Sequence, residues 1–372
     1  MKAIVVAGGT GGHIYPALAI INKIKEKEPE SDILYIGTTD RMEKDIVPKY
    51  NIKYVGIEMS GLNRKNIFKN ISVLNKYLKA KKSAHQIIAR FKPDIVIGVG
   101  GYITAPVISE AAKMGYKTVI HEQNSIPGLS NKMLAKKVDK IFISLPGSTK
   151  YFDNSDKIVY TGNPRSEEII KAKKMYKREA GFPSNKKLVI IVMGSLGSKT
   201  MTEKLRQIIL DVKDKNYSVM VITGKKYYDS YKDLDIPNNV KLYPFLNDLI
   251  GIMKDADLIV SRAGASTVSE ITAIGLPSIL VPSPYVTHNH QYLNAKELEM
   301  VGACKIIEEE NFTSATLIEE IDRLLNDNEA YTKMHEASQK IGINNSATRI
   351  YDEIKKIVGW FNGWYCWLNR KS

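Results

Sequence analysis

The stretch AIVVAGGTGGH, residues 3–13, decides how this chain folds. Its first five residues are apolar and predict a buried strand, and the glycines of residues 8–12 predict a tight turn. Apolar side chains then recur at helical spacing over residues 15–27. A strand that runs through a glycine-rich turn into a helix is typical of a parallel α/β sheet. Such a turn also brings backbone N–H groups, at the positive end of the helix, to a place where an anion can bind.

Strand-like segments alternate with helical segments along both halves of the chain, and the second half repeats the opening. Residues 188–193 form an apolar strand that runs into a second glycine-rich turn, residues 194–198, and a helix ending near Lys213. The further strand predictions are residues 33–36, 95–99, 118–121 and 140–143 in the first half and 218–223, 240–243, 258–261 and 278–281 in the second. We therefore predict an α/β protein of two Rossmann-like, doubly wound parallel-sheet domains that face each other across a cleft.

The domain boundaries follow from this repeat. Residues 1–163 are expected to form the N-terminal domain and residues 164–345 the C-terminal domain, because Asn163-Pro164 marks the exit from the first sheet. A helix over residues 346–358 is expected to return to the N-terminal domain. The aromatic and basic tail, residues 359–372, holds all three tryptophans of the chain. Its composition suits either a bilayer interface or a poorly ordered end.

The net charge of +14 on 372 residues implies an anionic partner. No run approaches the ~20 apolar residues of a membrane-spanning helix, and the apolar run before Gly8 is too short for a signal peptide, so we expect a cytoplasmic protein. The positive charge is concentrated in residues 59–93, which contain no Asp or Glu and show helical spacing of apolar residues. This helix could dock on anionic lipid, or it could be an ordinary core-facing helix with a solvated face. The residues expected at the membrane are Ile67, Phe68, Lys69, Ile71, Leu74, Lys76, Leu78 and Lys79.

Motifs of several other nucleotide-binding and metal-binding classes are missing. Ile14 stands where G-x-G-x-x-G needs its third glycine, and no G-x-x-x-x-G-K-[ST] occurs, which disfavours a dinucleotide dehydrogenase and a P-loop NTPase. Asp255 and Asp257 have the spacing of a metal-binding pair but directly precede a predicted strand, so we interpret them as a solvated pair at a helix end. We predict no metal and no other cofactor. No zinc knuckle or RNA-recognition signature supports nucleic-acid binding.

Seven motifs occur in order along the chain: residues 8–13 (GGTGGH), 39–43 (TDRME), 100–102 (GGY), 121–124 (HEQN), 162–164 (GNP), 262–270 (RAGASTVSE) and 290–295 (HQYLNA). Together they resemble the MurG family of peptidoglycan glycosyltransferases. The resemblance implies the two-domain GT-B architecture, with the lipid acceptor and the membrane on the N-terminal domain and UDP-N-acetylglucosamine on the C-terminal domain. It further implies an inverting hexosyl transfer to the C4 hydroxyl of undecaprenyl-diphosphate-linked N-acetylmuramoyl-pentapeptide. That reaction belongs at the cytoplasmic face of the cell membrane and to cell-wall synthesis, cell shape and cell division.

The resemblance also assigns residues to the donor. Glu270 matches the residue on the ribose hydroxyls, Leu246 matches a backbone contact to uracil, and Gln291 matches a contact to the sugar hydroxyls. The full set implied to bind the donor is Thr10, Gly11, Gly12, Asn124, Arg165, Ser195, Leu246, Ala265, Ser266, Thr267, Val268, Ser269, Glu270 and Gln291.

A single displacement at an anomeric carbon needs a base for the acceptor hydroxyl and a way to stabilise the departing diphosphate. His13, at the rim of the first glycine-rich turn, is the candidate base, although a histidine at a helix start is often only a structural residue. Glu122, His121 and Asp40 are alternatives that could act as the base or orient it. The rival function on the same two-domain frame is a UDP-N-acetylglucosamine epimerase, which would share the donor site but would not need a lipid-facing helix.

Overall fold

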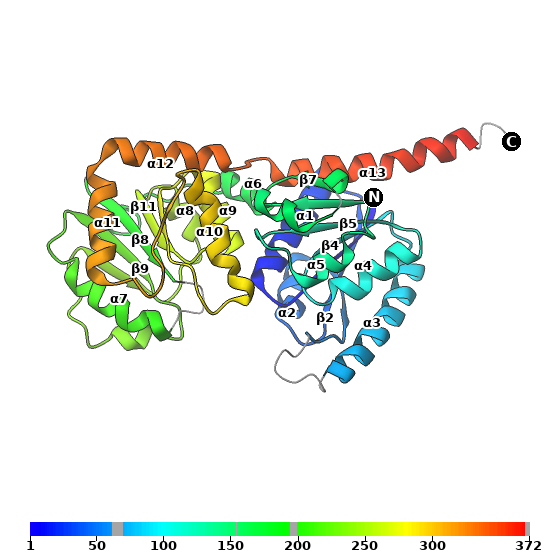
Figure 1. Cartoon of the computed structure of the whole chain (residues 1–372), viewed down its shortest axis with the longest axis horizontal. Coiled ribbons are helices and arrows are strands. Elements are labelled where there is room, and N and C mark those ends of the chain that lie inside the picture. Colours follow the sequence, from blue (N-terminus) through cyan, green and yellow to red (C-terminus); the bar gives the residue numbers. More distant parts are fainter. Residues whose placement is uncertain (62–69, 154, 194–198, 369–372) are drawn as a thin grey trace. The chain divides into compact units, whose positions relative to one another are not determined.

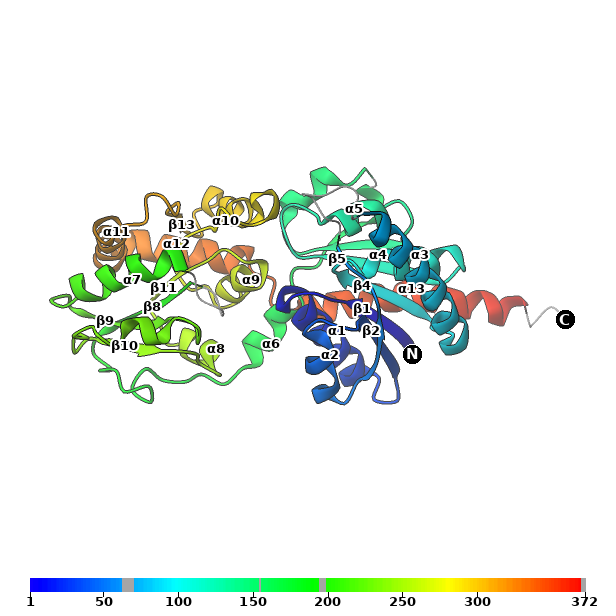
Figure 2. The same cartoon turned by 90° about the horizontal axis from the view of Figure 1, so that it is seen from below.

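The computed structural model describes residues 1–61, 70–153, 155–193 and 199–368. The chain divides into two compact units, one of Met1–Arg165 with Asn345–Ser372 and the other of Ser166–Asn344. Each unit is a parallel β-sheet covered by helices (Figures 1 and 2). The fold class of two Rossmann-like α/β domains is therefore confirmed.

The first unit, within the described residues, holds a seven-stranded parallel sheet in the order β3-β2-β1-β4-β5-β6-β7. The strands are β1 Lys2–Ala7, β2 Asp32–Thr38, β3 Lys53–Ile57, β4 Ile95–Gly100, β5 Lys117–Glu122, β6 Lys140–Ile143 and β7 Ile158–Tyr160. The strand order reverses between β1 and β4, which is the switch point where open α/β sheets bind ligands. The sequence predictions missed β3 and β7, the two edge strands, which pair on one side only and are less buried than the central strands.

Strand β1 is buried on both faces. Its residues Ala3, Val5 and Ala7 share one apolar cluster with α1 and α13, while Ile4 and Val6 share another with α3 and α4. The helices of this unit are α1 Gly11–Lys27, α2 Glu43–Ile46, α3 Asn70–Phe91, α4 Thr104–Lys113, α5 Leu129–Leu134 and α13 Ser346–Leu368, with short 3-10 helices at Val47–Tyr50, Pro146–Tyr151 and Ser155–Lys157. Helix α1 begins earlier than its predicted start at residue 15, directly after the turn, so the turn itself is short.

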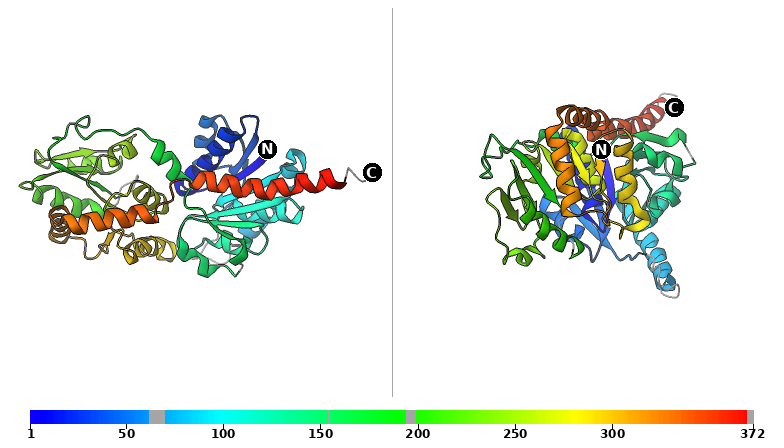
Figure 3. Two further views of the ribbon diagram at one scale, coloured as in Figure 1. Left: turned by 90° about the horizontal axis from the view of Figure 1, so that it is seen from above. Right: turned by 60° about the vertical axis from the view of Figure 1, so that its left-hand side comes forward.

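The C-terminal helix α13 runs along the first unit (Figure 3). Ile350 and Ile354 are fully buried in the same cluster as α1. At the end of α1, the Glu28 carboxylate accepts hydrogen bonds from the N-terminal amine at 2.8 Å, from the Tyr351 hydroxyl at 2.9 Å and from Lys355 Nζ at 2.8 Å. Burial alone would raise the pKa of Glu28, but these partners outweigh it and lower the pKa to about 2. An ion cluster thus ties the N-terminal amine and α13 to the end of α1.

The second unit, in its described part, holds a six-stranded parallel sheet in the order β10-β9-β8-β11-β12-β13, with its switch point between β8 and β11. The strands are β8 Lys187–Val192, β9 Tyr217–Ile222, β10 Val240–Tyr243, β11 Leu258–Ser261, β12 Ser278–Leu280 and β13 Lys305–Ile306. The helices are α6 Arg165–Lys171, which begins at the junction of the units, α7 Lys199–Asp211, α8 Leu249–Met253, α9 Ala265–Ile274, α10 His290–Met300, α11 Ser314–Asn326 and α12 Asn328–Ile341, with short 3-10 helices at Tyr228–Tyr231 and Thr287–Asn289.

Asp255 and Asp257 are anchored, so their interpretation as a solvated pair is wrong. Asp255 pairs with Lys174 Nζ at 2.6 Å and accepts from Lys177 N at 2.8 Å. Asp257 accepts from Lys177 Nζ at 2.9 Å and from Leu188 N at 2.7 Å. The two carboxylates therefore fasten the connector before β8 to the adjacent strand β11. Among the residues that the structure describes, no group of three or more His, Cys, Asp or Glu side chains could hold a metal ion.

Candidate active site

At the switch point of the first sheet, the first glycine-rich turn meets the turn that follows β4 at Gly100 and Gly101. Gly8 N, after β1, donates to Gly100 O, at the end of β4, at 3.2 Å. A Cβ on Gly101 would lie only 2.4 Å from Gly8 O, and Gly100 and Gly101 have φ of +117° and +90°. Only glycine combines this backbone conformation with so close an approach. The two turns therefore pack backbone against backbone at the carboxyl edge of the sheet.

His13 lies in the first turn of α1, with its ring over Gly100. Its Nδ1 donates to Gly8 O at 3.1 Å. Because a carbonyl oxygen can only accept, this contact places the ring proton of neutral His13 on Nδ1 and the lone pair on Nε2. The side chain is half-buried. A half-buried imidazole with a defined tautomer has the properties of a general base.

The Glu122 carboxylate is hydrogen-bonded to the segment that follows β5, residues 124–131. The Glu122 side chain is 2% exposed. One carboxylate oxygen accepts from Asn124 N at 2.9 Å and Asn124 Nδ2 at 3.2 Å, and the other accepts from Gly128 N at 2.9 Å and Asn131 Nδ2 at 2.8 Å. Four donors on two oxygens favour a positioning role for Glu122 over proton transfer. Asn124, expected near the donor sugar, is the half-buried residue that this carboxylate orients.

His121 is fully buried, and its ring links β5 to the exit from the first sheet. Nε2 donates to Gly162 O at 3.1 Å, and Nδ1 accepts from Gln123 Nε2 at 2.9 Å. Burial lowers the pKa of His121 to about 4. The ring is therefore neutral at pH 7, and its hydrogen bonds indicate a structural role.

The turn after β2 carries two acids with opposite environments. Asp40, a candidate in the sequence analysis, is exposed. Glu43, which the sequence analysis gave no role, is fully buried. Its carboxylate accepts from Thr38 N at 3.0 Å, from Thr38 Oγ1 at 2.7 Å and from Gly9 N, in the first glycine-rich turn, at 3.1 Å. The sequence of residues 40–45 does not distinguish Glu43 from the neighbouring acids. Only its burial in the structure identifies it.

The remaining N-terminal residues implied to bind the donor gather at the start of α1. Thr10 and Gly12 are exposed there, and the Thr10 carbonyl accepts from His13 N at 3.0 Å. The Arg165 guanidinium lies over the Tyr15 ring, 5.4 Å from its centroid. The structure thus places Arg165 beside the glycine-rich turn of the first unit.

In the second unit, the segment expected to bind the donor diphosphate forms the first turn of α9. Ala265, Ser266 and Thr267 are partly exposed and follow Gly264 at the helix start. The first N–H groups of a helix have no partner within it and favour an anion. Val268 packs inward: its side chain is 2% exposed, and its N–H donates to Gly264 O at 2.9 Å. Ser269 also faces inward, with its hydroxyl donating to Ser266 O at 2.7 Å.

A buried ion pair supports this segment. Arg262 follows β11 and pairs with Glu309 at 2.5 Å, while its other terminal nitrogen donates to Val281 O at 3.0 Å. Glu309 also accepts from Thr200 Oγ1, near the start of α7, at 2.8 Å. Asn294, fully buried on α10, donates to Ala263 O at 3.1 Å. The charge of Arg262 is thus neutralised within the protein, and Arg262 braces the α9 turn.

The other predicted donor residues lie on the same edge of the second sheet. Leu246 follows β10, Glu270 lies on α9 after β11, and Gln291 lies on α10 after β12. In a parallel sheet, all these segments leave the carboxyl edge, where ligands bind. Gln291 Oε1 accepts from Ser283 N at 2.9 Å, which directs its amide N–H groups elsewhere. Ser195 lies outside the described residues.

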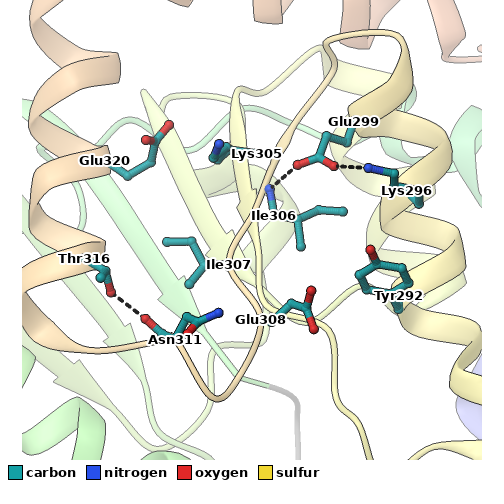
Figure 4. A pocket seen from close by; sticks show the side chains of 10 residues that line it. All are labelled: Tyr292, Lys296, Glu299, Lys305, Ile306, Ile307, Glu308, Asn311, Thr316 and Glu320. Carbon is teal, nitrogen blue, oxygen red and sulfur yellow. Dashed lines mark hydrogen bonds and ion pairs between the residues drawn. The ribbon is translucent and has the colours of Figure 1, made fainter.

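A hollow of about 450 Å³ lies beside β13 in the same unit (Figure 4). It is lined from α10, β13 and α11, and it includes none of the predicted donor residues. Glu299 in its wall pairs with Lys296 at 2.8 Å and accepts from Ile306 N at 3.2 Å. The hollow is therefore distinct from the donor segment, because none of the predicted donor residues lines it.

Helix α3 exposes two leucines one turn apart. Leu74 and Leu78 are 59% and 57% exposed, whereas Ala80 and Ala84 of the same helix lie in the core. Lys79 is exposed, but Lys76 pairs with Glu58 at 2.8 Å and its charge is partly neutralised. Of the other expected membrane residues, Ile67, Phe68 and Lys69 lie outside the described residues. No helix in the described part of the chain combines the length and the apolarity needed to cross a bilayer.

Residues 3–143 match the glycosyltransferase family 28 N-terminal domain, and residues 188–353 match the glycosyltransferase family 28 C-terminal domain. The chain therefore belongs to glycosyltransferase family 28 and is a glycosyltransferase. Within this class, it is 41% identical, over 96% of its length and 100% of the relative, to the UDP-N-acetylglucosamine–N-acetylmuramyl-(pentapeptide) pyrophosphoryl-undecaprenol N-acetylglucosamine transferase of Bacillus cytotoxicus.

Solved structures agree with this relationship. The crystal structure of MurG from Acinetobacter baumannii superposes with a TM-score of 0.78 at 28% identity and covers 95% of this chain and 99% of its own. A UDP-GlcNAc 2-epimerase from Neisseria meningitidis, solved with UDP-GlcNAc, has a TM-score of 0.68 at 17% identity and covers 96% of this chain and 100% of its own. At that identity, the likeness to the epimerase shows a shared fold alone.

Proposed function

We propose that this enzyme transfers N-acetylglucosamine from UDP-N-acetylglucosamine to the C4 hydroxyl of undecaprenyl-diphosphate-linked N-acetylmuramoyl-pentapeptide, with inversion, in peptidoglycan synthesis. The observation that carries the proposal is the full-length similarity to a transferase of that printed name, at 41% identity. Two features support the proposal, because such a transfer needs a base and a group that stabilises the departing diphosphate: His13 beside the first glycine-rich turn in one unit, and the start of α9 in the other.

The donor would be held by the second unit. The first-turn N–H groups of α9, at Ala265 to Thr267, suit the diphosphate, and the Glu270 carboxylate suits a ribose diol. When the bond between the sugar C1 and the phosphate oxygen breaks, UDP leaves with the bonding electrons and gains charge. The positive end of α9 would stabilise that charge.

His13 would act as the base. The acceptor C4 hydroxyl gives its proton to Nε2 as its oxygen attacks C1 from the face opposite the leaving UDP, which inverts the configuration. The Nδ1 contact to Gly8 O holds the ring in the tautomer that this step requires. Asn124, oriented by Glu122, would contact the sugar or the acceptor.

Labelled UDP-N-acetylglucosamine incubated with the lipid-linked acceptor tests the proposal. We expect the label to move to the lipid fraction, with no isomerisation of the donor when the acceptor is omitted. Isomerisation of the donor without an acceptor would instead identify an epimerase. Retention of all label in intact UDP-N-acetylglucosamine, with a folded protein, would refute the transfer.

The lipid acceptor also requires a membrane surface, and we propose that α3 docks on it as a peripheral element at the cytoplasmic face. Leu74 and Leu78 supply the apolar contact, and Lys79 supplies a cation for anionic headgroups. Burying two leucine side chains contributes roughly 3 kcal/mol, or a factor of ~10² in partition coefficient.

Co-sedimentation with vesicles containing phosphatidylglycerol tests the docking. Leu74→Glu with Leu78→Glu should reduce binding by ~10². Leu210→Glu is the matched control, because Leu210 is an exposed leucine of α7 in the second unit. Docking through α3 is rejected if the double variant binds as well as the control, or if binding ignores the anionic lipid content.

A further inference from the structure

Glu43 contacts the same peptide group that His13 contacts. The Gly9 N–H of the Gly8–Gly9 peptide donates to the Glu43 carboxylate at 3.1 Å. The Gly8 carbonyl of that same peptide accepts from His13 Nδ1 at 3.1 Å. One planar peptide thus connects a buried carboxylate to the imidazole proposed as the base.

A peptide bonded at both ends is more polar than an isolated one. An anionic acceptor at the N–H shifts electron density through the conjugated amide onto the carbonyl oxygen. The Gly8 oxygen then becomes a stronger acceptor for the Nδ1 proton. A histidine held through Nδ1–H by an acceptor keeps its lone pair on Nε2, as in sites where a carboxylate binds the ring directly.

The position of Glu43 is tightly constrained. The side chain is fully buried, and its other oxygen accepts from Thr38 N and Thr38 Oγ1 at 3.0 and 2.7 Å. A Cβ on Gly8 would lie 2.7 Å from Glu43 Oε1, so no other residue fits at Gly8 without moving the carboxylate. The carboxylate therefore joins the end of β2 to the turn after β1. It also takes the N–H that an external phosphate would otherwise use in this turn.

We infer that Glu43 is a positioning residue for the transfer, acting on His13 through the Gly8–Gly9 peptide and occupying the anion position of the first glycine-rich turn. This inference rests on the proposed role of His13 as the base. The buried carboxylate thus supplies the anion at the Gly9 N–H of this turn, and the Gly8 carbonyl of the same peptide orients the His13 ring.

The test combines kinetics with ¹⁵N NMR of histidine-labelled protein. Glu43→Gln keeps the shape of the side chain but replaces one carboxylate oxygen by an NH2 group. One of the N–H groups that Glu43 accepts from would then face another donor. We expect kcat to fall by ~10² with little change in KM for UDP-N-acetylglucosamine. We also expect the His13 ring to shift towards the Nε2–H tautomer. Glu110→Gln is the control, since Glu110 is a buried acid of the same unit that pairs with Lys81 and His85.

A second variant covers the case in which the first folds poorly. Glu43→Ala leaves a space in which formate can replace the carboxylate, so formate, and not formamide, should restore kcat in a saturable manner. The inference is overturned if Glu43→Gln keeps the wild-type tautomer and kcat, or if formate has no effect on a folded Glu43→Ala protein. If the wild type itself transfers no sugar, the proposed function fails, while the NMR comparison still decides whether Glu43 controls the His13 ring.

Discussion

Replacing Gly100 by alanine should displace His13 while leaving the fold intact. The new Cβ would lie 2.5 Å from His13 Cδ2 and 2.9 Å from Nε2. Because carbon atoms in contact prefer about 3.5 Å or more, the ring must move by about 1 Å. A misplacement of that size costs ~10² in kcat. The positive φ of +117° adds backbone strain of roughly 1–2 kcal/mol.

Gly115→Ala is the matched control for strain. Gly115 also has a positive φ, +82°, but its Cβ would meet no atom within 4 Å. Both variants should therefore lose stability from backbone strain in thermal unfolding, and Gly100→Ala should lose more because of its clash with His13. Only Gly100→Ala should lose kcat in the labelled transfer assay. Equal kcat values for the two variants would refute the placement of the His13 ring over Gly100.

Two further predictions concern ion pairs that do not involve His13. Glu309→Ala should lower the free energy of unfolding by ~3 kcal/mol in denaturant titrations, because it leaves Arg262 buried without its carboxylate partner. The double variant Glu309→Leu with Arg262→Met should recover most of that loss. A cost below ~1 kcal/mol for Glu309→Ala would contradict the bracing role. Glu28→Gln should cost ~1 kcal/mol at pH 7, since the ion cluster is partly solvated. The folded pKa of about 2 lies below the ordinary 4.5, so this difference should persist above pH 4.5 and shrink as the pH falls towards 2; a pH-independent difference would argue against an ionic origin.

The fold was predictable from the sequence wherever a strand lies in the middle of a sheet. Strands such as β1 and β8 are apolar on both faces, so each can be recognised in the sequence as a continuous apolar run. Strands β3, β7 and β13 lie at sheet edges, with fewer buried residues, and no comparable run marks them. Their pairing depends on the tertiary structure, which short-range patterns do not contain.

The candidate site was predictable only where a motif carries the chemistry in its residue types. The first glycine-rich turn and His13 are visible as a motif, and the structure adds the tautomer. The role of Glu43 depends on a contact with Gly9, in the turn after β1 and 34 residues away, so no local pattern reveals it. The inward orientation of Val268 and the anchoring of Asp255 likewise depend on which side of a helix or strand packs against the sheet.

The central claim, a transfer of N-acetylglucosamine to the lipid-linked acceptor with His13 as the base, is tested most directly by comparing wild type and His13→Ala in the same labelled assay. The account predicts that the wild type moves label to the lipid. It predicts that His13→Ala lowers kcat by ~10² or more while the donor binds with nearly unchanged affinity. Turnover near the wild-type value in a folded His13→Ala protein would contradict it.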